Sequence, residues 1–274
     1  MSASIAELLH KAPLEPLDAE ILLAEVLGVN RSYLYTWPEK LLPATTCHHF
    51  QQHVQRRLQG EPIAYIIGRK AFWTFELDVT PATLIPRPET ELLVEQALAR
   101  IPPHQTHSII DLGTGSGAVA LSIASERPHC QVIATDISKH AIQVAANNAK
   151  RLQLPNVQFV VGHWLAPFQP ASFDVIVSNP PYIAIDDPHL HQLTYEPQHA
   201  LVAGKMGLDD IEILVANAKH YLKTGGWLLL EHGYEQATTI QQLFHQANYT
   251  HITTYHDLAN LPRVTVGAVS LPFS

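Results

Sequence analysis

The 274-residue chain has little cysteine, and no long apolar run interrupts it. Its two cysteines, Cys47 and Cys130, lie far apart and form neither a CxxC pair nor a disulfide framework. No stretch reaches the roughly 18 apolar residues needed to span a bilayer. The first residues also lack the basic-then-apolar order of a signal peptide. These absences predict a soluble, cytoplasmic protein with reduced thiols and no membrane contact.

Positive charge is scarce as well. The chain carries 17 Lys and Arg against 25 Asp and Glu, for a formal net charge of -8. A broad phosphate-binding face is therefore not expected, and neither is direct contact with nucleic acid. Histidine is abundant, but neither an HExxH motif nor a Cys/His set accompanies His49 and His53, which are neighbours at helical spacing. We expect no metal site.

The amino-terminal third has helical periodicity. Asp18 to Leu27 predicts an amphipathic helix that ends at Gly28, and Thr45 to Leu58 predicts another that is stopped by Gly60. These helices suit either a docking domain for a partner or a helical cap on a larger domain. The residues alone do not choose between the two.

After Gly60 the periodicity changes to that of strands. Alternating residues from Phe72 to Val79 predict a β-hairpin. We expect a helical substrate-docking domain over residues 1–70, a hairpin linker over 71–84 and a catalytic domain over 85–274. From Ser108 onward strands alternate with helices, which predicts a doubly wound α/β fold. The expected strands are 108–111, 131–135, 157–161, 173–177, 227–231, 252–255 and 263–269.

One of these strands, Phe173 to Ser178, is followed by Asn179, Pro180, Pro181 and Tyr182. Ligands bind at the carboxyl ends of strands in open α/β sheets. The prolines have no N–H, so their backbones offer only acceptors. A planar NH2 group could donate to the Asn179 oxygen and to a proline carbonyl while it lies on the Tyr182 ring. The tetrapeptide therefore predicts a cradle for an amine or amide, although alone it also suits an ordinary turn.

A glycine-rich loop follows the first strand of the large domain. The sequence DLGTGSG begins at Asp111 and provides Gly113, Thr114, Gly115, Ser116 and Gly117. Glycine allows a tight turn and close approach of the backbone to a ligand. No Lys-Ser/Thr pair follows, so the loop is not a Walker phosphate loop. Asp136 ends the next strand, where its carboxylate can accept from ribose hydroxyls. Loop and acid predict a nucleoside cofactor, either a nicotinamide dinucleotide or S-adenosylmethionine.

The combination of sites favours S-adenosylmethionine. A carboxylate-led glycine loop, an acid after the second strand and NPPY after the fourth match methyltransferases that act on amino groups. The sulfonium cation of this cofactor suits an acid such as Asp111 beside the loop, which would repel a pyrophosphate.

The order of motifs is more specific still. The chain contains DAEILLAEVLG, GEPIAYIIG, IPRPETE, DLGTGSG, SNPPYI and LLLEHG between Asp18 and Gly233, followed by RVTVG. It thereby resembles the HemK/PrmC family, the protein-glutamine methyltransferases of peptide chain release factors. The resemblance implies a Rossmann-like methyltransferase with a seven-stranded, mostly parallel sheet. It also implies methylation of the glutamine amide in the Gly-Gly-Gln (GGQ) motif of a release factor, which modulates translation termination.

The resemblance also implies roles for individual residues. The catalytic residues would be Asn179, Pro180 and Tyr182, and substrate binding would add Pro181 and Arg87. The cofactor site would comprise Asp111, Gly113, Thr114, Gly115, Ser116, Gly117, Asp136, Trp164 and Asn179. The chain is expected to be a monomer.

One stretch departs from the family pattern. Asp257 to Arg263 lacks the glycine that members tend to carry there. Asn260 tolerates left-handed geometry and is expected to replace it.

Two other functions remain open. NPPY also serves the exocyclic amines of bases, so the runner-up is a methyltransferase of rRNA or DNA, although the acidic balance argues against it. The third is a non-catalytic binding protein on a methyltransferase fold.

Overall fold

The structure, a computed structural model, describes residues 2–270. The chain divides between Arg69 and Lys70 into two compact units, and each has its own buried core. A hairpin of β3 (Arg69–Phe72) and β4 (Phe75–Asp78) begins at this division. Among the described helices, none has both the length and the apolar character needed to cross a membrane.

The smaller unit is helical. Its predicted helices are present as α2 (Pro16–Leu27), which ends at Gly28 in left-handed geometry with φ 63°, and α4 (Ala44–Leu58). Three further helices were not predicted from the sequence: α1 (Ile5–Lys11), α3 (Arg31–Thr36) and α5 (Ile63–Ile67). Helices of five to seven residues are too short to show a full amphipathic period. A short antiparallel pair, β1 (Ala3–Ser4) and β2 (Leu41–Leu42), completes the unit.

The core of this unit follows from helical periodicity. Ala19, Leu22 and Leu23 lie three and four residues apart on α2, and all three are buried. They join Phe50 of α4 and Leu34 of α3 in one apolar cluster. The amphipathic patterns therefore bury one face of each helix against the others.

The larger unit contains the predicted seven-stranded sheet, in the order β10-β11-β9-β8-β5-β6-β7. Strands β9, β8, β5, β6 and β7 are parallel, whereas β11 and β10 are antiparallel at one edge. The strands are β5 (Ser108–Leu112), β6 (Gln131–Asp136), β7 (Val157–Val161), β8 (Phe173–Ser178), β9 (Leu222–Glu231), β10 (Thr250–His256) and β11 (Pro262–Ala268). Strand β9 begins five residues before the predicted start at Trp227. The prediction missed these first residues because they include Gly225 and Gly226, and a pair of glycines is typical of a turn.

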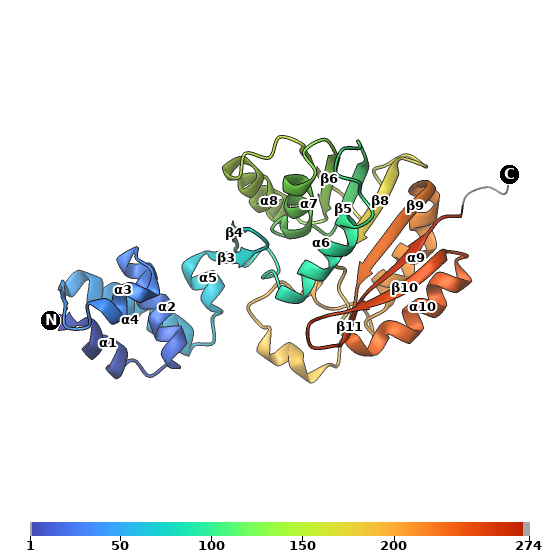
Figure 1. Cartoon of the computed structure of the whole chain (residues 1–274). Coiled ribbons are helices and arrows are strands. Elements are labelled where there is room, and N and C mark those ends of the chain that lie inside the picture. The colour runs from blue at the N-terminus through green and yellow to red at the C-terminus, as the bar shows by residue number, and fades with distance from the viewer. Residues whose placement is uncertain (1, 271–274) are drawn as a thin grey trace. The chain divides into compact units, whose positions relative to one another are not determined.

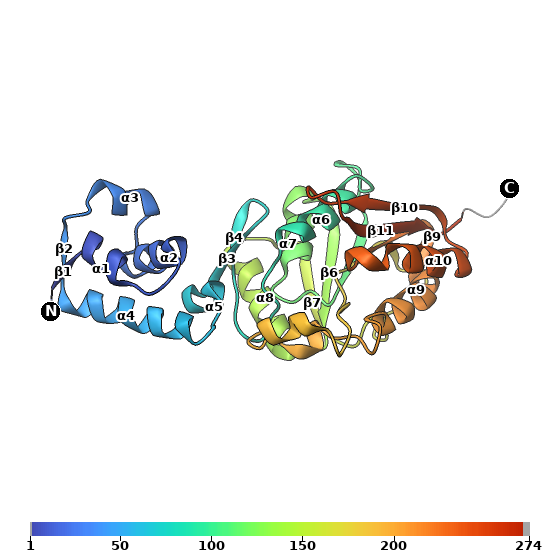
Figure 2. The same cartoon turned by 90° about the horizontal axis from the view of Figure 1, so that it is seen from below.

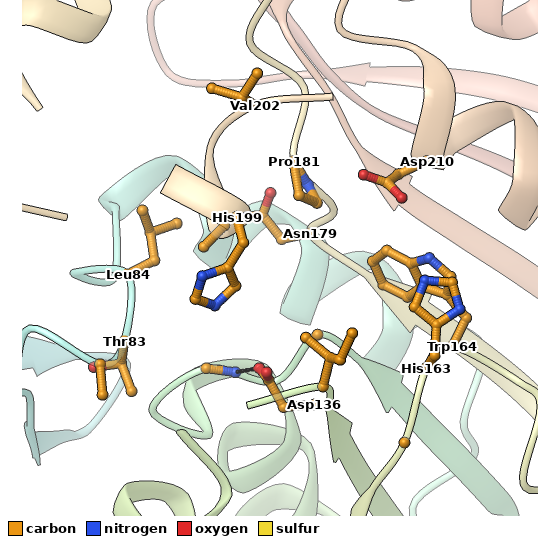
Figure 3. Close-up of a pocket in the computed structure, with 16 residues that line it drawn as sticks. Thr83, Leu84, Asp136, His163, Trp164, Asn179, Pro181, His199, Val202 and Asp210 are labelled. Carbon is orange, nitrogen blue, oxygen red and sulfur yellow. Dashed lines mark hydrogen bonds between the residues drawn. The ribbon is translucent and has the colours of Figure 1, made fainter. Parts of the chain in front are cut away.

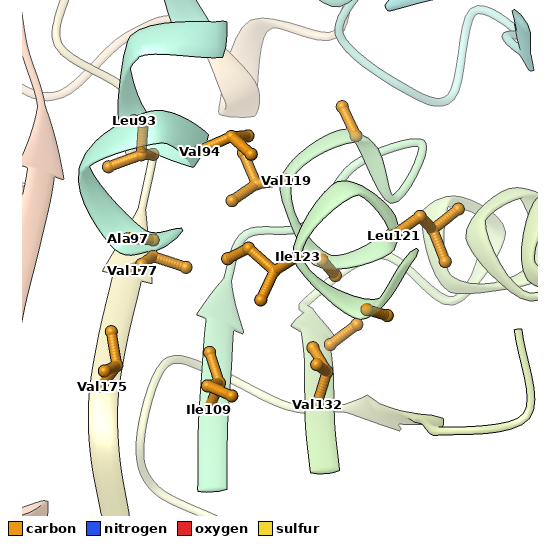
Figure 4. Packing of buried hydrophobic residues seen from close by; sticks show 14 of the residues in the cluster. Leu93, Val94, Ala97, Ile109, Val119, Leu121, Ile123, Val132, Val175 and Val177 are labelled. Atoms are coloured by element: carbon orange, nitrogen blue, oxygen red, sulfur yellow. The ribbon is translucent and has the colours of Figure 1, made fainter. Parts of the chain in front are cut away.

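Helices cover both faces of this sheet (Figures 1 and 2). Val175 and Val177 of β8 face one apolar cluster, and the intervening Ile176 faces another, as the two-residue period of a strand requires. Helices α6 (Glu91–Leu98), α7 (Ala118–Glu126) and α8 (Lys139–Arg151) contribute to the first cluster, part of which Figure 4 shows. Helices α9 (Asp209–Tyr221) and α10 (Ala237–Gln246) contribute to the second. Burial of both faces explains why the parallel strands read as continuous apolar runs.

The stretch that departs from the family pattern has the expected geometry. Asn260 adopts a left-handed conformation with φ 59°. Around it, Arg263 Nε donates to Asp257 Oδ2 at 2.9 Å, and the Leu261 backbone N–H donates to Asp257 Oδ1 at 2.9 Å. The loop is therefore closed by Asp257, and Asn260 has the left-handed geometry that a glycine would readily adopt there.

Two leucines provide a matched test of the core. Leu229, in β9, is fully buried, whereas Leu258 is fully exposed in the loop before β11. Leu229→Ala should lower the free energy of unfolding by about 2–5 kcal/mol, because it removes buried methyl groups and leaves a cavity. Leu258→Ala should change it by less than about 0.5 kcal/mol. Urea unfolding followed by circular dichroism measures both, and equal shifts would contradict this assignment of the core.

Candidate active site

The candidate site lies where three parallel strands end. Leu112 of β5 pairs with Thr135 of β6 and with Ser178 of β8. The residues that follow these three, Gly113, Asp136 and Asn179, therefore lie at the same edge of the sheet. Strand register alone brings the glycine loop, the predicted ribose acid and the NPPY tetrapeptide together.

A cavity of about 290 Å³ opens at this edge. This volume is at the lower limit of the roughly 300–1,000 Å³ that small-molecule sites occupy. Figure 3 shows Asn179 and Pro181 across the cavity from Asp136, with Leu84 on one side and Trp164 on the other. The segments that line it are 82–84, 113 and 115, 136–137, 162–164, 179 and 181, 199–200, 202 and 210.

The glycine loop presents its backbone to the cavity. The N–H groups of Gly113 and Thr114 both donate to the Thr135 carbonyl, at 2.9 and 2.8 Å, which holds the loop against β6. Gly115 has φ 57°, and a Cβ added there would meet no atom within 4 Å. Because Gly115 lines the cavity, we expect such a Cβ to occupy space that a ligand needs.

Asp111 lies beneath this loop, outside the lining of the main cavity. Its Oδ2 accepts from Thr114 Oγ1 at 2.6 Å and from the Ala120 backbone N–H at 3.1 Å. Burial raises the pKa of Asp111 to about 7, and the hydrogen bonds from Thr114 and Ala120 oppose the rise. Asp111 thus ties the loop to the first turn of α7.

Two other loop residues, Ser116 and Gly117, contact neighbouring parts of the protein. Ser116 is buried, and its carbonyl accepts from Asn148 Nδ2 at 2.9 Å. Gly117 has φ 91°, and a Cβ there would come within 2.9 Å of Leu121. Asp111, Thr114 and Ser116 line a second, smaller cavity of about 50 Å³ beside the main one.

Asp136 is largely buried, and both of its carboxylate oxygens are oriented by the backbone. Oδ2 accepts from the Gly115 N–H at 3.0 Å, and Oδ1 accepts from the Ser138 N–H at 2.8 Å. The carboxylate has further lone pairs that can accept from hydroxyl groups in the cavity. The predicted contact with a ribose remains a prediction.

The wall opposite Leu84 combines aromatic and acidic groups. Trp164 has φ 47° and faces the loop, since a Cβ on Gly113 would lie 3.4 Å from its indole. Burial raises the pKa of Asp210, while the Trp164 indole and His163 lower it. Ile137 extends the apolar part of the lining, although it is 60% exposed. The indole offers a flat apolar surface to an adenine, and the aliphatic side chain adds a further apolar contact.

Asp210 and Ile137 were missed by the sequence analysis. Asp210 is at the start of α9, where an acid ordinarily complements the helix dipole, so its position did not distinguish a ligand contact from a cap. Ile137 directly follows Asp136, and this adjacency was the one available signal for it.

The NPPY residues divide between the cavity and the core. Asn179 and Pro181 line the cavity, whereas Pro180 and Tyr182 are outside its described lining. The Tyr182 carbonyl accepts from Gln236 Nε2 at 3.0 Å. Burial chiefly raises the pKa of the Tyr182 phenol. The predicted stacking of substrate on this ring stays a prediction.

Arg87 contacts a segment that follows NPPY. Its guanidinium forms an ion pair with Glu196, which is almost completely buried and also accepts from the Ile85 N–H at 3.0 Å. Arg87 lines the smaller cavity, where Asn179 is also found. The observed ion pair fixes the loop before α6, and a contact between Arg87 and substrate stays a prediction.

The charge of the main cavity discriminates between the two cofactors that the loop allowed. Asp136 and Asp210 line it, and its described lining contains no Lys or Arg. A pyrophosphate would face two carboxylates with no Lys or Arg to offset them, whereas a sulfonium cation would be attracted to them. The residues present therefore fit S-adenosylmethionine.

Fold and site together define an S-adenosylmethionine-dependent methyltransferase. Residues 103–263 match the family model "Methyltransferase domain", and residues 2–68 match "PrmC N-terminal domain". The fold is also that of a solved methyltransferase from Pyrococcus furiosus, with a TM-score of 0.56 and 19% identity over 81% of this chain and 100% of that one.

Curated relatives narrow the class to a family. The "Release factor glutamine methyltransferase" of Coxiella burnetii is 50% identical over 250 residues, which cover 91% of this chain and 90% of the relative. The protein of the same name from Xylella fastidiosa is 48% identical over 256 residues, 93% of each chain. The chain belongs to the release factor glutamine methyltransferase family.

Two glycines provide a matched test of the cofactor loop. Gly115 and Gly28 both have left-handed geometry, and at neither would a Cβ meet an atom within 4 Å. Alanine at either position should cost about 1 kcal/mol of stability, because of backbone strain. Gly115→Ala should also weaken binding of S-adenosylmethionine by at least about tenfold, because the methyl group enters the cavity. Calorimetric titration measures this, and equal affinities of the two variants would contradict the assigned loop.

Proposed function

We propose that this chain transfers a methyl group from S-adenosylmethionine to the side-chain amide nitrogen of the glutamine in the GGQ motif of a peptide chain release factor, and thereby modulates translation termination. The names of its relatives support this substrate. The observation that carries it is the placement of Asn179, which lines the same cavity as Gly113 and Gly115 of the glycine loop and Pro181 of NPPY. We further propose a monomer that acts in the cytoplasm without direct contact with nucleic acid.

The cofactor would be held mainly by backbone and acidic groups. Gly113 and Gly115 would face it, Asp136 would accept from its ribose, and Trp164 would pack against its adenine. Asp111, Thr114, Ser116 and Gly117 would act indirectly, because they hold the loop in shape. When bound, S-adenosylmethionine supplies an electrophilic methyl group on a cationic sulfur.

The chain's own task is to orient a weak nucleophile. The nitrogen lone pair of a carboxamide is delocalised into the carbonyl, so a correct approach to the methyl group matters. The Asn179 side-chain oxygen and the Pro180 carbonyl would each accept one hydrogen of the glutamine NH2. Two such contacts fix both the position and the plane of the amide. Positioning of this kind can supply about 7–11 kcal/mol of a reaction barrier.

The first experiment measures transfer of label from S-adenosylmethionine to a purified release factor, with its GGQ Gln→Ala variant and an rRNA fragment as controls. Label should appear on the intact factor alone. Asn179→Ala should lower kcat by about a hundredfold or more, because a preorganised polar contact is lost, with little change in cofactor affinity. Label on RNA alone would keep the cofactor site and overturn the substrate, while unchanged kcat in Asn179→Ala would overturn the role of Asn179.

We also propose that the amino-terminal unit docks the body of the release factor. Tyr35, Trp37 and Leu41 of this unit are 66%, 55% and 69% exposed within one short stretch. Aromatic residues are enriched at protein–protein interfaces relative to the rest of the surface.

The docking proposal predicts a difference between two substrates. Trp37→Ser combined with Leu41→Ser should raise KM for the intact factor by about tenfold or more, because apolar contact is lost, and should leave KM for a short GGQ peptide unchanged. Leu258→Ser, on an exposed loop of the other unit, is the control. An equal effect on both substrates would instead indicate a general loss of folding.

A further inference from the structure

The amide of Asn179 can serve the proposed reaction in only one of its two orientations. Its oxygen can accept from a substrate NH2 group, whereas its own NH2 group would oppose that donor. The two ends of the amide are nearly identical in shape, so packing alone does not select between them. Hydrogen-bond partners outside the cavity must make the selection.

The first such partner is Thr90. Asn179 Nδ2 donates to Thr90 Oγ1 at 3.2 Å, and Thr90 is only 4% exposed. Thr90 occupies the N-cap position of α6, where a threonine hydroxyl commonly accepts from a backbone N–H of the first turn. Here it makes no such bond. Instead, its hydroxyl oxygen accepts from Asn179, which directly follows β8.

The second partner is Glu231. Ser178 of β8 pairs with Leu230 of β9, so Asn179 and Glu231 are the next residues of two neighbouring parallel strands. Glu231 is 1% exposed, and its Oε2 has no hydrogen-bond partner in the part of the chain that the structure describes. Burial raises the pKa of Glu231 to about 7, while the neighbouring Thr90 and Asn179 side chains and the charge of Arg263 lower it. Thr90 and Asn179 therefore both face this carboxyl group.

The donors and acceptors of these groups permit one consistent arrangement. Above pH 7 Glu231 is mostly ionised and has only acceptors, so the Thr90 O–H is the group that can donate to it. The Thr90 oxygen is then left as an acceptor and receives the Asn179 NH2 group. The Asn179 oxygen is consequently directed away from Thr90, toward the cavity.

We propose that Thr90 and Glu231 are positioning residues that fix the Asn179 amide with its oxygen toward the substrate. The inference rests on the proposed function, because it assumes that the acceptor is an NH2 group. It also assigns a role to the threonine of the IPRPET segment, which approaches Asn179 from the short 3-10 helix Pro88–Thr90 before α6.

The kinetic test uses three variants at pH 8, where Glu231 is mostly ionised. Thr90→Val keeps the shape of the side chain and removes the hydroxyl. Glu231→Gln introduces an NH2 group that can donate to Thr90 and reverse the order of donors. Each should lower kcat for the release factor by about tenfold or more, with unchanged affinity for S-adenosylmethionine. Thr90→Ser, which retains the hydroxyl, should stay within about threefold of the wild type.

A double-mutant cycle separates positioning from general structural damage. In an Asn179→Ala background, Thr90→Val should have no further effect on kcat, because there is no amide left to orient. An undiminished further loss would show that Thr90 acts through folding and would overturn the proposal. Wild-type kcat in Thr90→Val or in Glu231→Gln would overturn it as well, and would leave the proposed function intact.

A spectroscopic measurement makes the test independent of the substrate. The side-chain ¹H–¹⁵N signals of Asn179, assigned by their loss in Asn179→Asp, should shift in Thr90→Val and Glu231→Gln and change little in Thr90→Ser. The side-chain signals of Asn217, which donates to the Ile213 carbonyl at 2.7 Å on α9, should not move in any variant. Unchanged Asn179 signals would refute the relay even if the wild-type protein methylates no release factor.

Discussion

The parallel register of β6, β5, β8 and β9 is the constraint on which the site depends. It pairs Leu112 with Thr135 and Ser178, and Ser178 with Leu230. The residues that follow these positions therefore lie at one edge of the sheet: Gly113, Asp136, Asn179 and Glu231. A slip of one residue in β8 would turn Asn179 to the opposite face, because side chains alternate along a strand. The apolar residues of β8 face two different helical layers, and this packing makes such a slip costly.

Buried acids set the character of this edge. Asp111 and Glu231 are almost inaccessible, and burial raises the pKa of each to about 7. Neither lines the main cavity, so both act on the groups that do: Asp111 through the glycine loop and Glu231 through the Asn179 amide. Asp136 and Asp210 give the cavity itself an acidic lining that suits a cationic cofactor. Acids within the protein thus hold the backbone and amide groups that would contact the ligands.

Much of this arrangement could be predicted from the sequence. The apolar β-branched runs and glycine-rich turns located all seven strands of the sheet, and the acid-loop-acid-NPPY order indicated the edge at which the candidate cavity lies. Boundaries were less accurate where glycine interrupts a strand, as at Gly225 and Gly226 of β9. Contacts between distant segments could not be predicted. Thr90 and Asn179 are 89 residues apart, and no local pattern indicates that they are hydrogen-bonded. Asp210 was not predicted for a different reason. An acid in the first turn of a helix is already explained by its interaction with the helix dipole.

The most direct test of the account is a crystal structure of the protein with S-adenosylhomocysteine and a GGQ peptide. The account predicts that the glutamine nitrogen is within about 3.2 Å of both the Asn179 side-chain oxygen and the Pro180 carbonyl, with the cofactor's sulfur on the side of Gly115 and Asp136. A glutamine whose oxygen faces Asn179, or a peptide bound outside the cavity, would contradict it.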